Sequence, residues 1–195
     1  MAFSLIILYM TKTFITSDIH FGHQNIMKFC PESRARFKND VNYMNEQIIQ
    51  EWNAVVGPDD HTYILGDVSF MPWEKTVAIV RRLNGAKTLI KGNHDHKLVQ
   101  SAEFRDCFIE IADYKTITVD KVRISMFHYP ICEWDQMHRG AVHFHGHTHG
   151  NPTGLEGSRA LDVGMDVTGK VVMPMDEMIV KALKGEIRSH HQKGV

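Results

Sequence analysis

The sequence predicts a single α/β domain in which helices lie outside a mixed β-sheet system. In the first half, short β-prone segments alternate with amphipathic helical segments, whereas in the second half strand-like segments follow one another directly. The 195 residues are 43% hydrophobic, which is enough to bury a core. No repeat or linker divides the chain, so we expect one domain at residues 12–185. Residues 1–11 are expected to be an extension or the start of the first strand, and residues 186–195 a polar tail.

The first half has the order β-α-β-α-β. Three short runs of β-prone residues each lead straight into a polar cluster, which is typical of buried strands that end in functional loops. These runs are residues 12–16, 62–65 and 87–90. Between them, apolar side chains recur at helical spacing over residues 41–55 and 73–83. Pro72 near the first turn of the second helix and Gly85 just past its end support this interpretation.

The second half changes character. Residues 115–119 and 122–127 flank the pair Asp120-Lys121 in the pattern of a β-hairpin. Further strands are expected at residues 141–145 and 159–163. A last helix is expected over residues 176–183, with Asp176 as its N-terminal cap.

Composition excludes several classes of protein. Lysine and arginine total 22 against 23 aspartate and glutamate, so the formal net charge of −1 offers no basic surface for a long nucleic acid. The three cysteines lie far apart and outside any CxxC spacing, which indicates reduced thiols and a cytoplasmic location. The apolar run at residues 3–10 is too short to cross a bilayer, so no membrane partner is expected. Thirteen histidines are many for this length and suggest a metal site.

Five clusters of potential metal ligands follow the ends of predicted strands. They are Asp18-Ile19-His20, Gly66-Asp67, Gly92-Asn93-His94-Asp95, His128 and Gly146-His147-Thr148-His149. Because sites in open α/β sheets form beyond the carboxyl ends of strands, these clusters are expected to converge. Asp18 and His20 are two residues apart, so in an extended chain both side chains would point the same way and could hold one ion. The glycine before three of the clusters allows tight turns and close backbone approach.

The donor set indicates two ions rather than one. Two carboxylates, one amide oxygen and four imidazoles exceed what one tetrahedral ion can use, so two ions that share a carboxylate fit better. Paired metals about 3.5–4 Å apart clamp a phosphoryl group, generate hydroxide at neutral pH and stabilise the attacking and leaving oxygens. Two divalent cations (+4) with Asp18 and Asp67 (−2) leave a local charge of +2, which would attract an anionic substrate. Phosphate-ester hydrolysis is the reaction that this chemistry predicts.

The ordered clusters closely resemble those of the calcineurin-like metallophosphoesterase superfamily, whose pattern is Asp-x-His, Gly-Asp, Gly-Asn-His-Asp/Glu, a lone His and Gly-His-x-His. The resemblance extends over residues 12–185. Within it, residues 14–23, 128–130 and 161–164 are similar to a small single-domain bacterial and phage branch of phosphoesterases. The resemblance implies a four-layer αββα sandwich with two central mixed β-sheets.

The resemblance also implies a role for each residue of the site. Asp18, His20 and His149 would bind the first metal, Asn93, His128 and His147 the second, and Asp67 would bridge both. His94 would be free of metal and would face the phosphate, where it protonates the leaving oxygen or stabilises its charge.

Two departures from the family pattern qualify these expectations. Many relatives carry an aspartate that holds the catalytic histidine, where this chain has Phe70. The Asp-Arg-Gly sequence of the phosphoprotein phosphatases is also replaced, by residues 68–72, so activity on phosphoproteins is not expected.

Further residues beside the motifs are candidate outer partners of the ligands or substrate contacts. They are His23, Arg34, Arg36, Lys91, Asp95, His96, Tyr129, His143 and His145. Each has a structural alternative: Asp95 could cap the following helix, and the cations could be solvated. Phe21, Tyr129 and Trp134 could stack on a base or simply pack in the interior.

The sequence thus predicts a dinuclear metal-dependent phosphodiesterase acting on a small substrate, such as a nucleotide or cyclic nucleotide. A diester is favoured because no arginine clamp for a dianionic monoester accompanies the motifs. A nuclease, a phosphomonoesterase and a non-catalytic scaffold of the same fold are the alternatives. Manganese is the favoured metal, and Fe, Co, Ni or Zn would also suit mixed oxygen and imidazole ligands.

Overall fold

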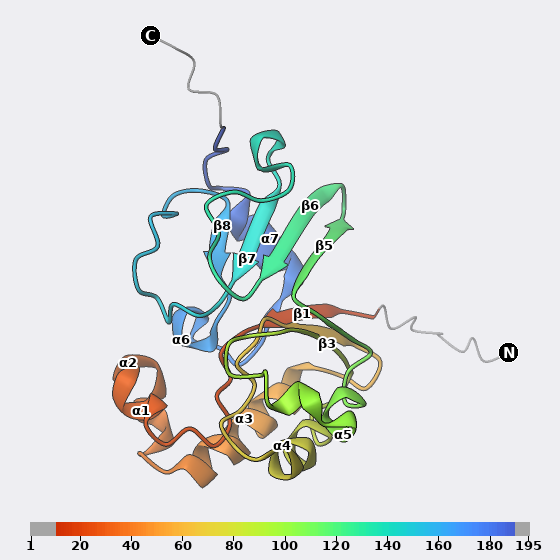
Figure 1. The fold of residues 1–195 in the computed structure, drawn as a ribbon. Helices are drawn as coiled ribbons and strands as arrows, with labels where there is room; N and C mark the ends of the chain where they lie inside the picture. The colour runs from red at the N-terminus through yellow and green to blue at the C-terminus, as the bar shows by residue number, and fades with distance from the viewer. Residues whose placement is uncertain (1–10, 190–195) are drawn as a thin grey trace, which may run out of the picture.

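Two β-sheets form the centre of the protein (Figure 1). The computed structural model describes residues 11–189. The strands of the first sheet are β1 (Thr13–Thr16), β2 (His61–Ile64), β3 (Ala86–Ile90), β4 (Glu110–Ala112) and β9 (Met173–Pro174). Their order is β4-β3-β2-β1-β9, in which the first four run parallel and β9 pairs antiparallel with β1.

The second sheet is also mixed. Its strands are β5 (Tyr114–Val119), β6 (Val122–Phe127), β7 (Val142–His145) and β8 (Ala160–Asp162). β5 and β6 are antiparallel, whereas β6, β7 and β8 run parallel. Asp120 and Lys121 connect β5 to β6 with φ of 47° and 68°, as a two-residue type I′ turn requires. The predicted hairpin is therefore confirmed.

Helices cover the outer face of the first sheet. The two longer ones there are α3 (Val41–Val55) and α4 (Trp73–Val80), which lie below the sheet in Figure 1. The Asp40 carboxylate caps α3 by accepting hydrogen bonds from two backbone N–H groups of its first turn. The other helices are α1 (Ile26–Phe29), α2 (Pro31–Arg34), α5 (Ala102–Arg105), α6 (Met165–Thr168) and α7 (Met175–Ala182). Single 3-10 turns are η1 (Ala35–Phe37), η2 (Leu98–Gln100) and η3 (Met137–Arg139).

Alternation along the strands of the first sheet builds two separate cores. Phe14, Ile64 and Leu89 belong to the cluster formed with α3 and α4. The next residue along the chain in each case points to the opposite face, because side chains alternate along a strand. These next residues, Ile15, Leu65 and Ile90, pack with apolar residues of the second sheet and of α7. The predicted α/β class with two mixed sheets and helices is confirmed.

Several details differ from the sequence-based expectations. The last helix begins at Met175 after Pro174, so Asp176 lies in its first turn and is not its cap. The predicted helix over residues 73–83 ends at Val80, and Leu83 is buried beyond that end. β4 and β9 were not predicted, because segments of three and two residues carry no readable alternation.

The structure describes the two ends of the chain only in part. Residues 1–10 and 190–195 lie outside the described residues, so the expectation for the N-terminal extension is not tested. In the predicted polar tail, the Glu186 N–H donates to Gly157 O, which ties the start of that segment to the domain. Over residues 11–189, no helix is both long and apolar enough to cross a membrane.

The topology brings the predicted clusters together. β1, β2 and β3 are parallel neighbours, so the loops that follow them leave the same edge of the sheet. The backbone N–H of Asp18 donates to Gly66 O, and that of His20 to Asp67 O, which joins the first two loops. The Gly146 N–H donates to His128 O, which joins the loops after β6 and β7.

Candidate metal centre

Many of the candidate ligands lie on loops with left-handed backbone conformations. Those with positive φ are Asp18 (56°), His20 (58°), Asp67 (55°), His147 (70°) and His149 (49°). Such conformations cost a non-glycine residue about 1–3 kcal/mol and concentrate where function requires a fixed geometry. The expectation that Asp18 and His20 meet because their segment is extended is therefore wrong. A tight left-handed path brings the two side chains together instead.

Glycines allow the loops to approach closely. Gly66 has a φ of +88°, and a Cβ atom there would lie 2.5 Å from Cα of Gly92. A Cβ on Gly146 would collide with the side chains of Ser17 and Asp18. Any larger residue at either position would push apart the loops that carry the ligands, as the sequence predicts.

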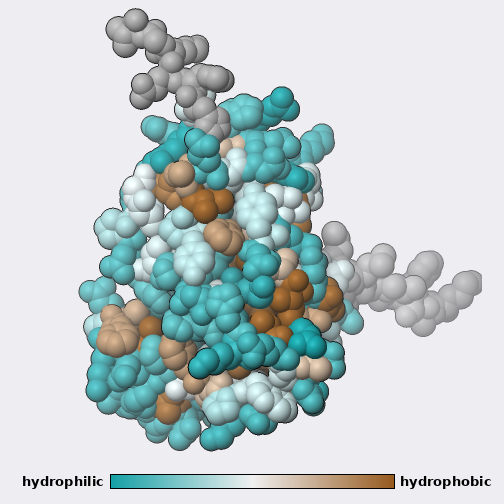
Figure 2. Space-filling view, viewed as in Figure 1, coloured by the Kyte–Doolittle hydropathy of each residue, from teal (hydrophilic) through white to brown (hydrophobic). Residues whose placement is uncertain are grey.

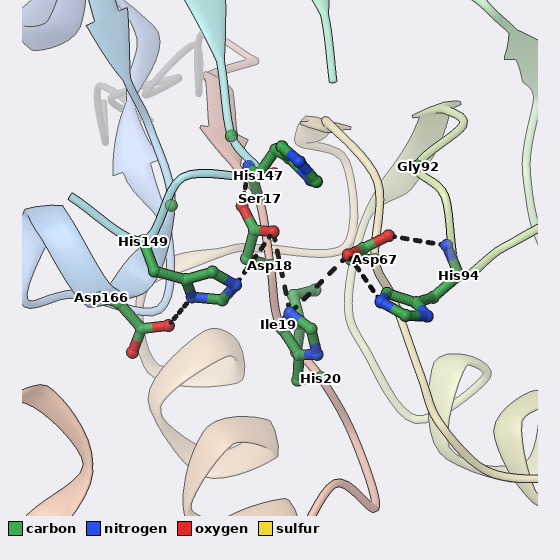
Figure 3. Close-up of polar contacts among 12 residues, drawn as sticks. Ser17, Asp18, Ile19, His20, Asp67, Gly92, His94, His147, His149 and Asp166 are labelled. Carbon is green, nitrogen blue, oxygen red and sulfur yellow. Dashed lines mark hydrogen bonds and ion pairs between the residues drawn. The ribbon is translucent and has the colours of Figure 1, made fainter. Parts of the chain in front are cut away.

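Asp18, His20 and His149 form the first group of potential metal ligands (Figure 3). Oδ1 of Asp18 lies 3.7 Å from Nε2 of His20 and 3.7 Å from Nε2 of His149. Within residues 11–189, Asp18 Oδ1 and His20 Nε2 are among the few buried polar side-chain atoms without a hydrogen-bond partner. Such unpartnered atoms are costly, and a cation held between them would satisfy both. This donor set fits a divalent metal.

Asp67, His128 and His147 form the second group, with ligand atoms within 4.8 Å of one another. Oδ1 of Asn93 lies 2.9 Å from Nε2 of His128, so the amide oxygen faces the same space. Nδ1 of His128 lies 2.7 Å from the carbonyl oxygen of Leu65, to which it donates. In the neutral ring, that bond leaves the lone pair on Nε2, which is the form that a ligand needs.

Asp67 lies between the two groups. Its Oδ2 is 3.8 Å from Nε2 of His20 in the first group, and its Oδ1 is 3.6 Å from Nε2 of His128 in the second. Figure 3 shows His20 between the carboxylates of Asp18 and Asp67. A carboxylate with one oxygen toward each group has the placement that a bridging ligand requires.

His94 belongs to neither group. Its side chain is 42% exposed, and its Nε2 lies 3.8 Å from Oδ2 of Asp67. Its backbone N–H donates to Oδ1 of Asp67 at 3.0 Å, which fixes the residue at the mouth of the site. A catalytic role for His94 remains a prediction, and this open position is where such a role requires the ring to be.

Burial and neighbouring charges set the protonation of the ligands. Burial lowers the pKa of His20 and of His147, which favours the neutral imidazole that binds a cation. Burial raises the pKa of Asp18, but the close approach of His20, together with His128 and His149, outweighs burial and holds that pKa below its usual value. Burial lowers the pKa of His149, yet its hydrogen bond with Asp166 outweighs burial and raises it.

A buried ion pair between Arg34 and Asp166 supports the first ligand group. Nε of Arg34 donates to Oδ1 of Asp166 at 2.7 Å, and its Nη2 donates to Oδ2 at 2.8 Å. The same guanidinium donates to the backbone carbonyls of Asp18 and Ile19. Asp166 in turn accepts a hydrogen bond from Nδ1 of His149 at 2.7 Å, which directs Nε2 of that ring toward Asp18. Arg34 thus holds the backbone of the ligand loop and the partner of His149, and its side chain is fully buried.

Asp95 supports the bridging residue in a similar way. Its Oδ2 accepts hydrogen bonds from the N–H groups of Asp67 and Gly92, and its Oδ1 accepts one from Val68. The carboxylate is fully buried, and burial raises its pKa. These contacts join the loops after β2 and β3. Asp95 is therefore an outer partner of Asp67.

The two other positively charged side chains that were predicted to contact substrate lie away from the pocket. Arg36 pairs with Glu51 at 2.8 Å, and Lys91 pairs with Asp113 at 2.8 Å. Neither lines the pocket beside the ligands. Their placement does not support the expectation that they contact a second phosphate.

The predicted outer histidines separate into two sets. His23 lies beside the first group, with its Nδ1 3.3 Å from Nδ1 of His20, while His96 lines a hollow that it shares with His94. His143 and His145 are buried, and the backbone occupies both ring nitrogens of His143. Nδ1 of His145 lies 3.0 Å from the carbonyl oxygen of Gly146.

The aromatic candidates for base stacking are placed differently from one another. Tyr129 packs its ring against His147 at a centroid distance of 4.6 Å. Phe21 is fully buried in the first core. Trp134 is 7% exposed and stacks on His143. Phe21 and Trp134 are therefore packing groups.

A pocket of about 670 Å³ opens beside the first group. His20, His94 and His149 reach it from the ligand loops, and α1, α2 and the connection between them contribute much of the rest of its lining. Its size lies within the usual range for small-molecule sites. The site therefore has room for a substrate.

Comparison with known proteins identifies the family of the chain. The sequence model for calcineurin-like phosphoesterases matches residues 11–131, more than half of the chain. The chain belongs to the calcineurin-like phosphoesterase family. The resemblance carried by the five clusters is thereby confirmed, and the metal groups have the chemistry that a metal-dependent family requires.

Relatives of similar length match most of the chain. An uncharacterized protein of Methanocaldococcus jannaschii, MJ1445, is 29% identical, over 91% of this chain and 95% of its own length. The Gene 66 protein of Mycobacterium phage L5 is 27% identical, over 84% of this chain and 90% of its own. A crystal structure of the protein of unknown function AQ665 from Aquifex aeolicus aligns with a TM-score of 0.67 and 25% identity, covering 87% of this chain and 98% of that one.

Sequence reasoning missed one central residue of this calcineurin-like site. Asp166 holds both Arg34 and His149, yet it lies just beyond residues 161–164 and is not part of that motif. A signal was present, because Asp166 comes shortly after β8, just as the ligand clusters follow their own strands. The aromatic residues Phe29 and Phe70, which line the pocket, were also not predicted as contacts.

Proposed function

We propose that this calcineurin-like phosphoesterase uses two divalent cations to hydrolyse a small phosphodiester, such as a nucleotide or cyclic nucleotide. The observation that carries the proposal is the placement of Asp67 between two ligand groups, with unpartnered ligand atoms in the first. Asp18, His20 and His149 would hold one cation, Asn93, His128 and His147 the other, and Asp67 both. Manganese is the favoured metal.

The bound cations would supply Lewis-acid stabilisation of the phosphoryl oxygens and activation of water. The protein residues would do the rest. Asp166 and Arg34 orient His149, and Asp95 orients Asp67, so that the ligands need little rearrangement on binding. His94, with its side chain open to the pocket, would hold the proton that the leaving oxygen receives.

A diester is favoured over a monoester by the charges around the pocket. Among the lining residues that the structure describes there is no lysine or arginine, and Arg34 is committed to Asp166. A dianionic monoester would gain from an additional cation, whereas a diester carries a single negative charge. The near-neutral charge of the chain likewise favours a small substrate over a long nucleic acid.

The proposal is tested with two substrates that share a leaving group. The protein is loaded with Mn²⁺, its metal content is measured by mass spectrometry, and hydrolysis of bis(p-nitrophenyl) phosphate is compared with that of p-nitrophenyl phosphate. We expect two metal ions per chain, a higher kcat/KM for the diester, and loss of activity with a chelator. Asp113→Asn, a change in an exposed carboxylate, serves as the control for Asp67→Asn.

The alternatives have distinct outcomes. A higher kcat/KM for the monoester would establish a phosphomonoesterase. Cleavage of single-stranded oligonucleotides that exceeds cleavage of both chromogenic esters, and that falls steeply with salt, would establish a nuclease. Two bound metals with no hydrolysis of any ester would indicate a scaffold. We further propose a cytoplasmic location, which the three free cysteines support.

A further inference from the structure

Three aromatic rings form one side of the pocket beside the metal groups. His23 stacks on Phe70 with a centroid distance of 3.8 Å and an interplanar angle of 10°. Phe29, at the end of α1, meets the His23 ring edge to face at 6.0 Å. We call His23, Phe29 and Phe70 the aromatic wall.

The aromatic wall is continuous with the metal groups. Phe70 lies 5.0 Å from the ring of His20 and 4.2 Å from that of His94, measured between centroids. A phosphate held at the ligands of the first group would therefore lie beside the wall. All three rings, together with His20 and His94, line the same pocket of about 670 Å³.

The two phenylalanines of the wall are exposed although they are apolar. Phe29 is 69% exposed and Phe70 is 39% exposed, which is unusual because most other phenylalanines within residues 11–189 are buried. On the face shown in Figure 2, hydrophobic surface occurs as small separate patches, one of them on the side where α1 and α2 lie. Aromatic rings kept open beside a charged site are typical of positions that stack on a ligand.

The charges around the wall define what it can accept. The pocket lining includes the carboxylates of Glu32 and Asp166 and, within the described residues, no lysine or arginine. Lys97 lies in a different hollow, which shares Phe70 and His94 with the pocket but not Phe29. A second phosphate would thus gain nothing beside the wall, whereas a flat uncharged group would bury both its own apolar surface and that of the rings.

We infer that the aromatic wall is the subsite for the nucleobase of a nucleoside phosphate ester whose single phosphate lies at the metal groups. This inference rests on the proposed function and names its substrate class. The exposed Phe29 ring offers the stacking surface, and the His23–Phe70 stack fixes the position of the base relative to the ligands. The base contributes affinity, while the phosphate brings the reacting bond to the metals.

Two inhibitors that differ by the base test the inference. Adenosine 5′-monophosphate and ribose 5-phosphate carry the same phosphate and sugar, and each is titrated against hydrolysis of bis(p-nitrophenyl) phosphate. Stacking of a base on an aromatic side chain corresponds to about a 5- to 150-fold gain in affinity. We therefore expect the inhibition constant of the nucleotide to be lower by that factor. Adenosine 5′-diphosphate should inhibit no better than the monophosphate.

Variants of the wall should remove this preference. Phe29→Ala should bring the two inhibition constants close to each other and leave that of ribose 5-phosphate unchanged, because Phe29 contacts no metal ligand among the described ring contacts. Phe70→Leu keeps an apolar side chain but removes the ring, and it should also reduce the ratio. Ile109→Ala, at a site that is likewise 69% exposed, is the matched control and should leave the ratio as it is.

The outcomes separate this inference from the proposed function. Equal inhibition by the two compounds in the unaltered protein, or a ratio that survives both wall variants, would overturn the nucleobase subsite while hydrolysis still supports the phosphodiesterase. If no ester is hydrolysed, the proposed function fails. Isothermal titration calorimetry of the same two compounds then gives the ratio of dissociation constants directly and decides the subsite on its own.

Discussion

Replacement of Arg34 by methionine separates two roles that this residue could have. The sequence places Arg34 near the first motif, where it could contact a phosphate, whereas the structure buries it completely behind the ligands. Methionine has a similar length and no charge, so Arg34→Met removes the guanidinium and largely keeps the packing. If Arg34 contacts substrate, the variant should change KM. If Arg34 instead holds the ligand loops from within the core, the variant should lower the stability of the fold and the affinity for metal.

The expected magnitude follows from the contacts of the guanidinium. It donates two hydrogen bonds to the Asp166 carboxylate and one each to the carbonyls of Asp18 and Ile19, at 2.7–3.0 Å. The variant leaves a buried carboxylate without its cation, and removal of one partner from such a pair costs about 3–5 kcal/mol. A domain of this size has about 5–15 kcal/mol of stability, so the variant should still fold, with Tm lower by about 6–20 °C.

Urea-induced unfolding, followed by tryptophan fluorescence, measures this loss. Arg36→Met is the matched control, because Arg36 forms an exposed pair with Glu51 that is worth about 0–1 kcal/mol. The metal affinity of the first group should also fall, by about 10- to 100-fold, since Asp166 would no longer be held against His149. If the two variants lose the same stability and only KM rises in Arg34→Met, the structural role of Arg34 is refuted and Arg34 contacts substrate.

Three further predictions concern the metal site and the second sheet. Asp67→Asn should lower activity by about 10² or more and reduce the bound metal measured by mass spectrometry, because a neutral amide cannot bridge two cations. His94→Ala should keep the metal content and lower kcat by about 10²–10⁴-fold, and the loss should be larger for an alkoxide than for a nitrophenolate leaving group. Burial, with His145 nearby, lowers the pKa of His143 to about 4. The native state thus prefers neutral His143, and stability should be full above pH 6.5 and fall by about 2 kcal/mol from pH 7 to pH 5. Urea unfolding should show a smaller fall in His143→Gln.

Much of the site was accessible from sequence because its residues follow strands. Each ligand cluster comes directly after a β-prone run, and parallel neighbours place such clusters at one edge whatever the details of packing. The convergence of Asp18, His20 and Asp67 needed no more than this rule. The left-handed conformation of these residues was not predicted, because local sequence favours it only weakly and the fold imposes it.

The contacts behind the ligands could not be predicted in the same way. Arg34 and Asp166 are 132 residues apart, and their pairing depends on how α2 packs against α6. A charged residue in a short helix that begins at a proline is normally solvated, so no sequence pattern indicated that Arg34 is buried. The prediction that Asp176 caps α7 was wrong for a related reason. Pro174 already belongs to β9, and pairing of that strand with β1 sets where the helix begins.

The two buried charges act on the ligand loops in complementary ways. Arg34 is a donor and binds the carbonyls of the loop after β1, whereas Asp95 is an acceptor and binds the N–H groups of the loops after β2 and β3. Both sets of backbone groups would be unpaired in loops that turn this sharply, at a cost that burial makes large. Each charge therefore satisfies the backbone and fixes a strained ligand at the same time. This coupling explains how the fold holds Asp18 and Asp67 in left-handed conformations.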